Sequence, residues 1–195
     1  AELRADKKAD GQAIEKLAEC EKVLRDPVVS DKDKAIALAG FLHIGGDIHQ
    51  PLHSSSRVTD REPNGDIGGN TFLLTPEGTP RESQQNLHWF WDSIVPRNIP
   101  YDFGFCEGCY VKHIAEAFIS RYSFDAEKGG LALSNYVSWK DESLRLAQGE
   151  VFRSDLKRFE APSGAYRRNA LSVSERRLTI AGYRMGETLN EIFGK

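Results

Sequence analysis

Two short segments of the sequence repeat the same pairing of histidine with aspartate. His43 stands four residues before Asp47, and His88 stands four residues before Asp92. At this spacing the two side chains of a pair lie on one face of a helix. An imidazole nitrogen beside a carboxylate oxygen suits zinc and its neighbours better than calcium or magnesium. The repeat therefore indicates a metal site assembled from two helices.

A third candidate donor, His53, lies between the two pairs and directly follows a helix-breaking Pro51-Leu52 step. A single His–Asp pair at this spacing is most often a surface ion pair or a core histidine with satisfied hydrogen bonds. Two such pairs in apolar helices favour a ligand instead, because buried polar groups without partners are costly.

The other residues near these donors have different expected roles. We expect Gly45 and Gly46 to leave space beside the first pair. We expect His49 to orient a ligand or to cap the broken helix, and His113 to face solvent.

Helical periodicity dominates the elements that must position these residues. Ser30 and Asn86 are expected N-caps, and Pro27 and Pro51 are expected helix stops. The expected helices run from about Ile14 to Pro27, from Ser30 to Pro51, from Asn86 through Asp92, and over residues 110–121, 131–148 and 175–193.

The remaining segments are expected to be loops and one short hairpin. Residues 54–70 are expected to form a loop, and residues 149–174 an irregular segment. Residues 71–75 are expected to form a short strand, and residues 76–80 a turn that could fold the chain back on this strand. The sequence thus predicts a mainly α protein, one helical domain over residues 1–195 with a small β-hairpin insertion.

Composition and charge exclude several classes of protein. With 39% hydrophobic residues the chain can bury a sizeable core, which excludes wholesale disorder. The net charge of −3 argues against a general polyanion binder, and no apolar run reaches the roughly 18 residues that a membrane span needs. Residues 43–107 carry a net charge of −5 and residues 145–184 a net charge of +5. This contrast suits divalent cations beside a phosphate-bearing substrate, or two solvated faces of opposite sign.

The three cysteines leave their pairing open. Cys106 and Cys109 could form a local disulfide, which would imply an oxidising compartment, or stay free thiols. No second cysteine pair exists to complete a zinc ribbon. With a local disulfide, Cys20 would be unpaired or bonded outside this chain.

Three blocks of the sequence resemble the S1/P1 nuclease family, zinc-dependent nucleases that share a fold with zinc phospholipase C. The blocks are His43-x-x-Gly-Asp47-Ile-His-Gln-Pro-Leu-His53, then Asp66-Ile-Gly-Gly-Asn70, then Asn86-Leu-His88-x-x-Trp91-Asp92. Later segments around Trp139–Ser143 and Ala181–Arg184 fit as well. The resemblance covers essentially the whole chain and implies the zinc phospholipase C/nuclease fold.

The resemblance implies a role for each matching residue. It implies three zinc ions, with His43 and Asp47 as ligands of the first and Asp47 bridging to the third. It implies that His53, His88 and Asp92 hold the second zinc.

The resemblance also implies substrate contacts. Gly69 and Asn70 correspond to a loop that contacts the nucleotide, and Ile67 to an apolar wall for a base. Trp91 corresponds to a structural residue. At Trp89 and Phe90 we favour core packing over stacking on a base.

The family's remaining ligands lie in an N-terminal segment, and this sequence has no histidine before His43. We therefore expect one zinc to be fully liganded by this chain and the other two only in part, with the missing ligands on upstream residues or on a companion fragment. The resemblance also implies a secreted or periplasmic protein, although residues 1–8 show no targeting segment.

The function implied by the resemblance is hydrolysis of single-stranded DNA or RNA to 5′-nucleotides by zinc-bound hydroxide, with Asp47 at the catalytic centre and the protein acting as a monomer. One alternative is a phospholipase-C-like zinc hydrolase. A second alternative is a non-catalytic helical subunit with one structural zinc.

Overall fold

A computed structural model describes residues 11–101 and 106–194 of the chain. Within these ranges the protein is built from helices, which confirms the mainly α prediction. The longer helices are α1 (Ala13–Arg25), α2 (Asp31–Asp47), α5 (Glu107–Arg121), α7 (Tyr136–Leu146) and α8 (Gly164–Phe193). The shorter ones are η1 (Pro51–Ser54), η2 (Arg81–Ser83), α3 (Leu87–Asp92), α4 (Ile94–Asn98), α6 (Phe124–Glu127), η3 (Lys128–Gly130) and the π-helical η4 (Ala147–Val151).

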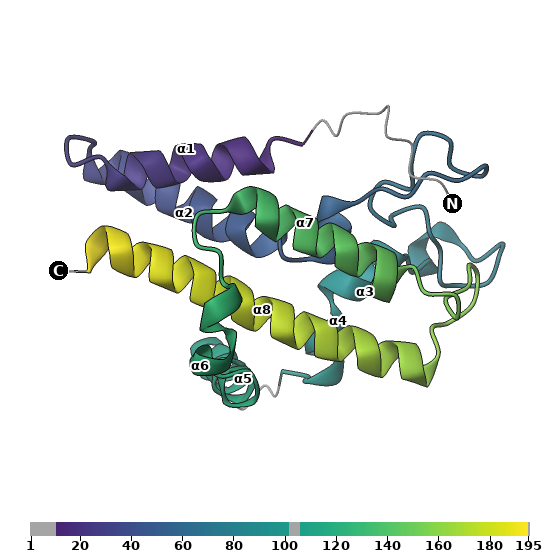
Figure 1. Cartoon of the computed structure of the whole chain (residues 1–195). Coiled ribbons are helices and arrows are strands. Elements are labelled where there is room, and N and C mark those ends of the chain that lie inside the picture. The colour runs from purple at the N-terminus through teal and green to yellow at the C-terminus, as the bar shows by residue number, and fades with distance from the viewer. Residues whose placement is uncertain (1–10, 102–105, 195) are drawn as a thin grey trace.

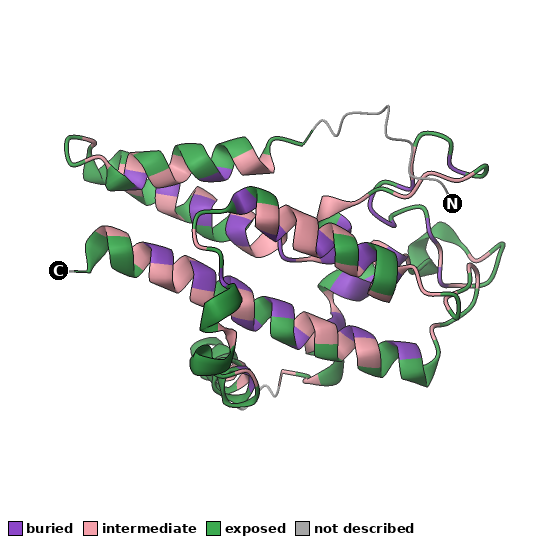
Figure 2. Cartoon of the chain, in the orientation of Figure 1, coloured by how far each residue is buried: buried purple, intermediate pink, exposed green. Residues whose placement is uncertain are grey.

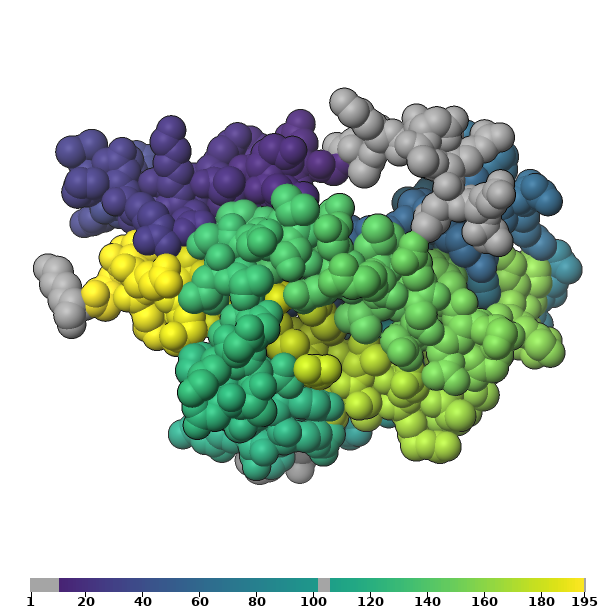
Figure 3. Space-filling view, in the orientation of Figure 1, coloured from purple at the N-terminus to yellow at the C-terminus, as the bar shows by residue number. Residues whose placement is uncertain are grey.

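α1 and α2 pack as an antiparallel pair, and α8 packs along α2 (Figure 1). α7 runs antiparallel to α8 and packs on η1 and α1. Buried residues follow the inward sides of α2, α7 and α8 (Figure 2). In the space-filling view, α7 lies over the middle of the molecule between α1 and α8 (Figure 3). α5 and α6 pack on the outer side of α8, opposite α1 and α2 (Figure 1).

Two hydrophobic clusters make up the interior, and the chain passes from one to the other just after α2. The first cluster includes Phe41 of α2 and Trp139 of α7, and it extends to Ile48. The second begins at Leu52 and includes Trp91 of α3. Residues 48–52 therefore connect the two clusters.

Local signals in the sequence set several helix boundaries as expected. The Ser30 hydroxyl accepts the backbone N–H of Asp33 at 3.2 Å and caps α2. The Asn86 side chain accepts the N–H of Trp89 at 2.7 Å and caps α3. These caps satisfy N–H groups that the first turn of a helix leaves free.

Two local predictions need correction. Residues 71–75 form no strand: Leu73 and Asn86 make a single antiparallel bridge, so the expected hairpin is reduced to a folded-back loop. The segment 149–174 is not irregular throughout, because α8 already begins at Gly164. Ser163 caps this helix by accepting the N–H of Tyr166 at 3.0 Å, and Tyr166 and Ala170 are buried against the second cluster.

Cys106 and Cys109 form a disulfide at the start of α5, and Cys20 is a free thiol. Of the two possibilities that the sequence left open, the local disulfide is therefore the one present. None of the helices in the described ranges has the combined length and hydrophobicity needed to cross a lipid bilayer.

Candidate metal centre

The structure brings His53, His88 and Asp92 together although they come from two separate elements. His53 lies on η1, and the other two side chains project from the same face of α3. One donor atom from each residue lies within 4.8 Å of the others. The Nε2 atoms of His53 and His88 lie 3.2 and 3.3 Å from the two Asp92 carboxylate oxygens.

The two nitrogen–oxygen separations match what a zinc ion requires of its ligands. Tetrahedral zinc with bonds of about 2.0–2.2 Å separates its donors by about 3.3–3.6 Å. The two imidazole rings stack with centroids 4.9 Å apart and an interplanar angle of 10°. Two nitrogens and one oxygen also form a donor set typical of catalytic zinc, which leaves further positions open.

A backbone carbonyl orients His88. Its Nδ1 lies 2.8 Å from the carbonyl oxygen of Gly68 and donates to it, so the proton resides on Nδ1 and the lone pair on Nε2. Hydrogen bonds of this kind fix the tautomer and the ring plane of metal-binding histidines. Gly68 has φ +59°, and a Cβ at this position would lie 2.6 Å from the carbonyl oxygen of Leu52. Only glycine fits here without displacing backbone.

Gln50 orients Asp92 and was not singled out by sequence reasoning. Its Nε2 donates to the Oδ1 of Asp92 at 2.9 Å, and its own side-chain oxygen accepts the N–H of Leu52. The amide is thus held at both ends, and it restricts the Asp92 carboxylate to one orientation. Its position three residues before His53, within the first sequence block, is the feature of the sequence that could have indicated this role.

The other predicted pair lies directly beside the triad. Asp47 Oδ2 is 3.4 Å from His43 Nε2 and 3.7 Å from His53 Nδ1. The Asp47 carboxylate therefore stands between two imidazoles, as a bridging ligand would. His43 is largely exposed, with 77% of its side chain open to solvent. The expectation that both glycines leave space is confirmed for Gly46, where a Cβ would meet nothing within 4 Å. It is wrong for Gly45, where a Cβ would lie 2.7 Å from Met185 Sδ on α8.

His49 is buried and supports the end of α2 instead of facing the donors. Its Nδ1 donates to the carbonyl of Gly45 at 2.7 Å, and its Nε2 accepts from Arg184 at 2.9 Å. Burial, reinforced by the charge of Arg177, lowers the pKa of His49 to about 3, so the ring is neutral. The expectation that it caps the broken helix is confirmed, as is the solvent exposure of His113.

Arg177 and Arg184 of α8 both bind the carboxylate of Glu142 on α7, and both also contact His49. Arg184 bonds both Glu142 oxygens, at 2.7 and 2.8 Å, and Arg177 bonds one at 2.8 Å. Burial alone would raise the pKa of Glu142, but the hydrogen bonds and charges of the two arginines outweigh it and lower the pKa. Ser143, next to Glu142, donates to the carbonyl of Ile48 at 2.6 Å.

The predicted substrate-contacting loop stands next to His88. Ile67 is exposed, with 67% of its surface open and φ +53°. Asn70 is also exposed, and its side-chain amide donates to the Ile67 carbonyl at 2.8 Å. Gly69 is buried: its N–H donates to Asp66 and its carbonyl accepts the N–H of Phe72.

An internal acidic and basic network holds this loop in place. Asp66, fully buried, accepts the N–H groups of Arg57 at 2.8 Å and of Gly69 at 3.1 Å. Arg158 pairs with buried Glu62 and donates to the carbonyl of Thr71 at 2.7 Å. Part of the positive charge in residues 145–184 is therefore used in internal ion pairs. The sequence had predicted that this charge would face either a phosphate-bearing substrate or solvent.

The aromatic residues of α3 divide differently from the prediction. Phe90 and Trp91 are buried, and Trp91 donates to the hydroxyl of Tyr166 at 3.1 Å, which fits the expected structural role. Trp89, by contrast, is 50% exposed, so the expectation of core packing is wrong for this residue. It lies one residue from His88, on a face of α3 that the core does not cover.

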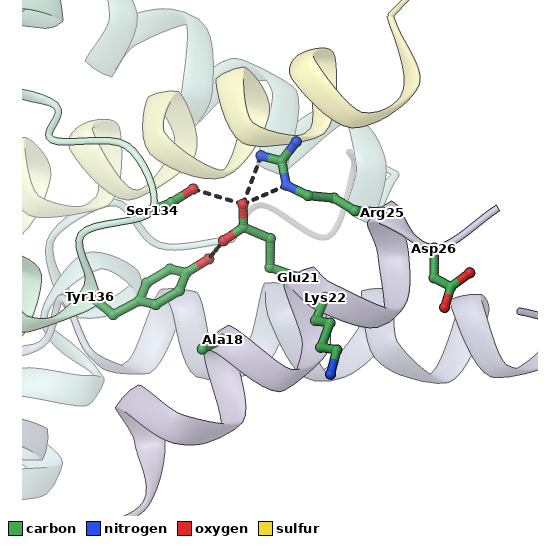
Figure 4. A pocket seen from close by; sticks show the side chains of 7 residues that line it. All are labelled: Ala18, Glu21, Lys22, Arg25, Asp26, Ser134 and Tyr136. Carbon is green, nitrogen blue, oxygen red and sulfur yellow. Dashed lines mark hydrogen bonds and ion pairs between the residues drawn. The ribbon is translucent and has the colours of Figure 1, made fainter.

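A separate depression of about 460 Å³ lies between α1 and the start of α7 (Figure 4). Its central carboxylate, Glu21, already accepts hydrogen bonds from Ser134, Tyr136 and Arg25. The five predicted metal donors do not line it. The depression is therefore separate from the candidate centre.

The fold and the site define a helical protein in which α2, η1 and α3 carry a cluster of candidate metal donors. The family model S1/P1 Nuclease matches residues 2–194, and the chain belongs to that family. Endonuclease 5 of Arabidopsis thaliana is 28% identical over 176 residues, covering 80% of this chain and 51% of that protein. Nuclease S1 of Aspergillus oryzae is 26% identical over 166 residues, with 80% and 54% covered, and nuclease P1 of Penicillium citrinum is 23% identical over 203 residues, with 95% and 68% covered. The chain thus spans about half the length of the first of these relatives.

Proposed function

We propose that the chain acts in a zinc-dependent nuclease that hydrolyses single-stranded DNA or RNA to 5′-nucleotides. The convergence of His53, His88 and Asp92 within 4.8 Å is the observation that carries this proposal. Membership of the S1/P1 nuclease family and the names of the relatives support it.

The five candidate ligands have different proposed roles in metal binding. In this proposal His53, His88 and Asp92 would hold one zinc. His43 and Asp47 would contribute to a second, and the other oxygen of Asp47 would be available to a third. Zinc, when bound, offsets negative charge on the phosphate oxygens and makes a bound water acidic enough to act as nucleophile. Gly68 and Gln50 keep the lone pairs of His88 and Asp92 aimed at the metal position, and Asp47 stands at the catalytic centre.

The loop beside His88 is proposed to hold the nucleotide. Ile67 presents an apolar side chain to solvent, and Asn70 has a side-chain oxygen available while its amide is bonded to the loop. Gly69 contributes by letting the loop pack closely on Leu52 and Leu87. We expect Asn70→Ala to weaken nucleotide binding without changing zinc content.

The setting of the protein is also part of the proposal. The Cys106–Cys109 disulfide supports a secreted or periplasmic location, since disulfides persist in oxidising compartments. We propose that residues 1–195 act as one domain unit and as a monomer, with further zinc ligands supplied by residues outside this sequence.

His88→Ala tests the proposal directly, with His113→Ala as the matched control on exposed α5. Loss of one of three protein ligands should weaken zinc binding by more than about 100-fold, beyond the usual effect of losing a residue that only orients a ligand. Zinc affinity is measured by competition with a chromophoric chelator. Hydrolysis is measured on single-stranded DNA and on a phosphatidylcholine analogue.

In protein that includes the further zinc ligands, we expect His113→Ala to behave as wild type and His88→Ala to lose hydrolysis of the single strand. Retained zinc affinity in His88→Ala would refute the metal site. Turnover of the phosphatidylcholine analogue in place of DNA would refute the nuclease assignment and favour the lipid hydrolase.

A further inference from the structure

Trp89 is the exposed member of the three tryptophans in this chain. Trp91 and Trp139 are 2% and 0% exposed, whereas half of the Trp89 surface is open to solvent. Trp89 lies between the proposed ligands His88 and Asp92 on α3. An indole kept in water gives up the stability that burial would bring, so its placement beside the metal donors suggests a contact with something outside the chain.

One face of this indole is covered by a cation from α4. The guanidinium carbon of Arg97 lies 3.9 Å from the centre of the Trp89 ring. Arg97 Nε donates to the hydroxyl of Ser93 at 2.6 Å, which holds the guanidinium in place. Because Arg97 covers one face of the indole, the exposed area of Trp89 lies on the other parts of the ring.

The positive charge near Trp89 comes from two arginines that form no ion pair within 4.0 Å with a carboxylate of residues 11–101 and 106–194. Neither Arg97 nor Arg167, near the start of α8, forms an ion pair there, in contrast to Arg158, Arg177 and Arg184. Burial and the nearby charge of Arg167 both lower the pKa of Arg97. Arg167 Nε donates to the Pro162 carbonyl at 2.9 Å, so this second side chain is also held. Both guanidinium groups are thus held by neutral partners, a hydroxyl and a carbonyl, which leaves their charges available to an anion.

We propose that Trp89, Arg97 and Arg167 form a second contact site for single-stranded nucleic acid, with a base stacked on the indole and a phosphate held by the guanidinium groups. An aromatic platform beside a positive surface is the usual arrangement for binding single strands, because unpaired bases expose their faces for stacking. The inference rests on the proposed nuclease function for the identity of the ligand. It adds a contact for the strand beyond the loop that carries Ile67, Gly69 and Asn70.

Binding of a fluorescein-labelled thymidine octanucleotide to the full chain in EDTA tests this site without hydrolysis. Trp89→Ala should weaken binding about fivefold or more, the lower range for loss of one base–aromatic stack. It should leave the salt dependence unchanged. Arg97→Gln and Arg167→Gln should each reduce the slope of log K against log salt by about 0.7, the value for one phosphate contact on a single strand.

Matched controls exist for both kinds of change. Phe193, 52% exposed at the end of α8, serves for the aromatic, and Arg145, an exposed arginine on α7, serves for the cations. Phe193→Ala and Arg145→Gln should bind as wild type. An abasic strand of the same length retains the phosphates, so Trp89→Ala should not weaken its binding.

Wild-type affinity in Trp89→Ala, or equal losses on the thymidine and abasic strands, would overturn the stacking site. Unchanged salt slopes in both arginine variants would overturn the phosphate site. Because the assay contains no free metal, the result is independent of the hydrolytic proposal. Binding that follows these expectations while zinc and hydrolysis assays fail would leave this site in place and remove the nuclease function.

Discussion

Replacing Gly68 with alanine should both destabilise the fold and loosen the metal centre. At φ +59° an alanine pays about 1–2 kcal/mol for the left-handed conformation. Its Cβ would lie 2.6 Å from the Leu52 carbonyl oxygen, so backbone must move, and overpacking of this kind costs about 1–3 kcal/mol. The free energy of unfolding should therefore fall by about 2–5 kcal/mol.

The same displacement should affect zinc binding. The Gly68 carbonyl holds His88 Nδ1 at 2.8 Å, and losing such a partner typically weakens metal affinity by about 10–100-fold. Urea denaturation measures the first effect, and chelator competition on the folded protein measures the second.

Gly182→Ala is the matched control, because a Cβ at that exposed position on α8 meets nothing within 4 Å. Because alanine has a higher helix propensity than glycine, this substitution should stabilise the protein by up to about 1 kcal/mol. If Gly68→Ala unfolds at the same urea concentration as wild type and binds zinc equally well, the argument that this glycine positions His88 is wrong.

Two further changes probe the supporting structure. Glu142→Gln should lower the unfolding free energy at pH 7 by about 3–5 kcal/mol, because it leaves Arg177 and Arg184 buried without their carboxylate. Since the pKa of Glu142 is lowered on folding, its contribution is present above about pH 4.5 and is lost as the pH falls, so urea melts of the variant should show a weaker acid dependence than wild type. Reduction of the Cys106–Cys109 disulfide should cost at most about 2 kcal/mol, the chain-entropy value for so short a loop, and a thermal melt in dithiothreitol that loses much more would contradict this.

The sequence predicted helix caps and stops, and the spacing of the candidate donors, because these signals are local. That the donors bind metal stays a prediction. The caps at Ser30 and Asn86, the stop at Pro51 and the four-residue His–Asp spacing each act within one or two helical turns. Whether the two pairs meet depends on the fold, and the structure shows that they do.

The supporting residues could not be read in the same way. Arg177 and Arg184 look like surface cations in a basic segment, and only the packing of α8 against α7 shows that both are buried on Glu142. The prediction for Trp89 was wrong for the opposite reason. An aromatic residue beside Phe90 and Trp91 predicts burial, but α3 turns the Trp89 side chain toward solvent. The start of α8 at Gly164 was hidden by polar residues on its exposed side.

The placement of the donors along the chain has a consequence for the order of folding. All five candidate metal ligands fall between His43 and Asp92, whereas the helices α7 and α8 that fasten this region are made later. A chain still emerging from the ribosome therefore already carries its complete local donor set before those helices exist. If these residues hold zinc as proposed, a bound ion would bring η1 and α3 together early, since metal binding and folding draw on the same free energy. Docking of α8 would then stabilise η1 and α3 in positions already close to the native ones. Refolding should therefore be faster when zinc is present from the start than when it is added last.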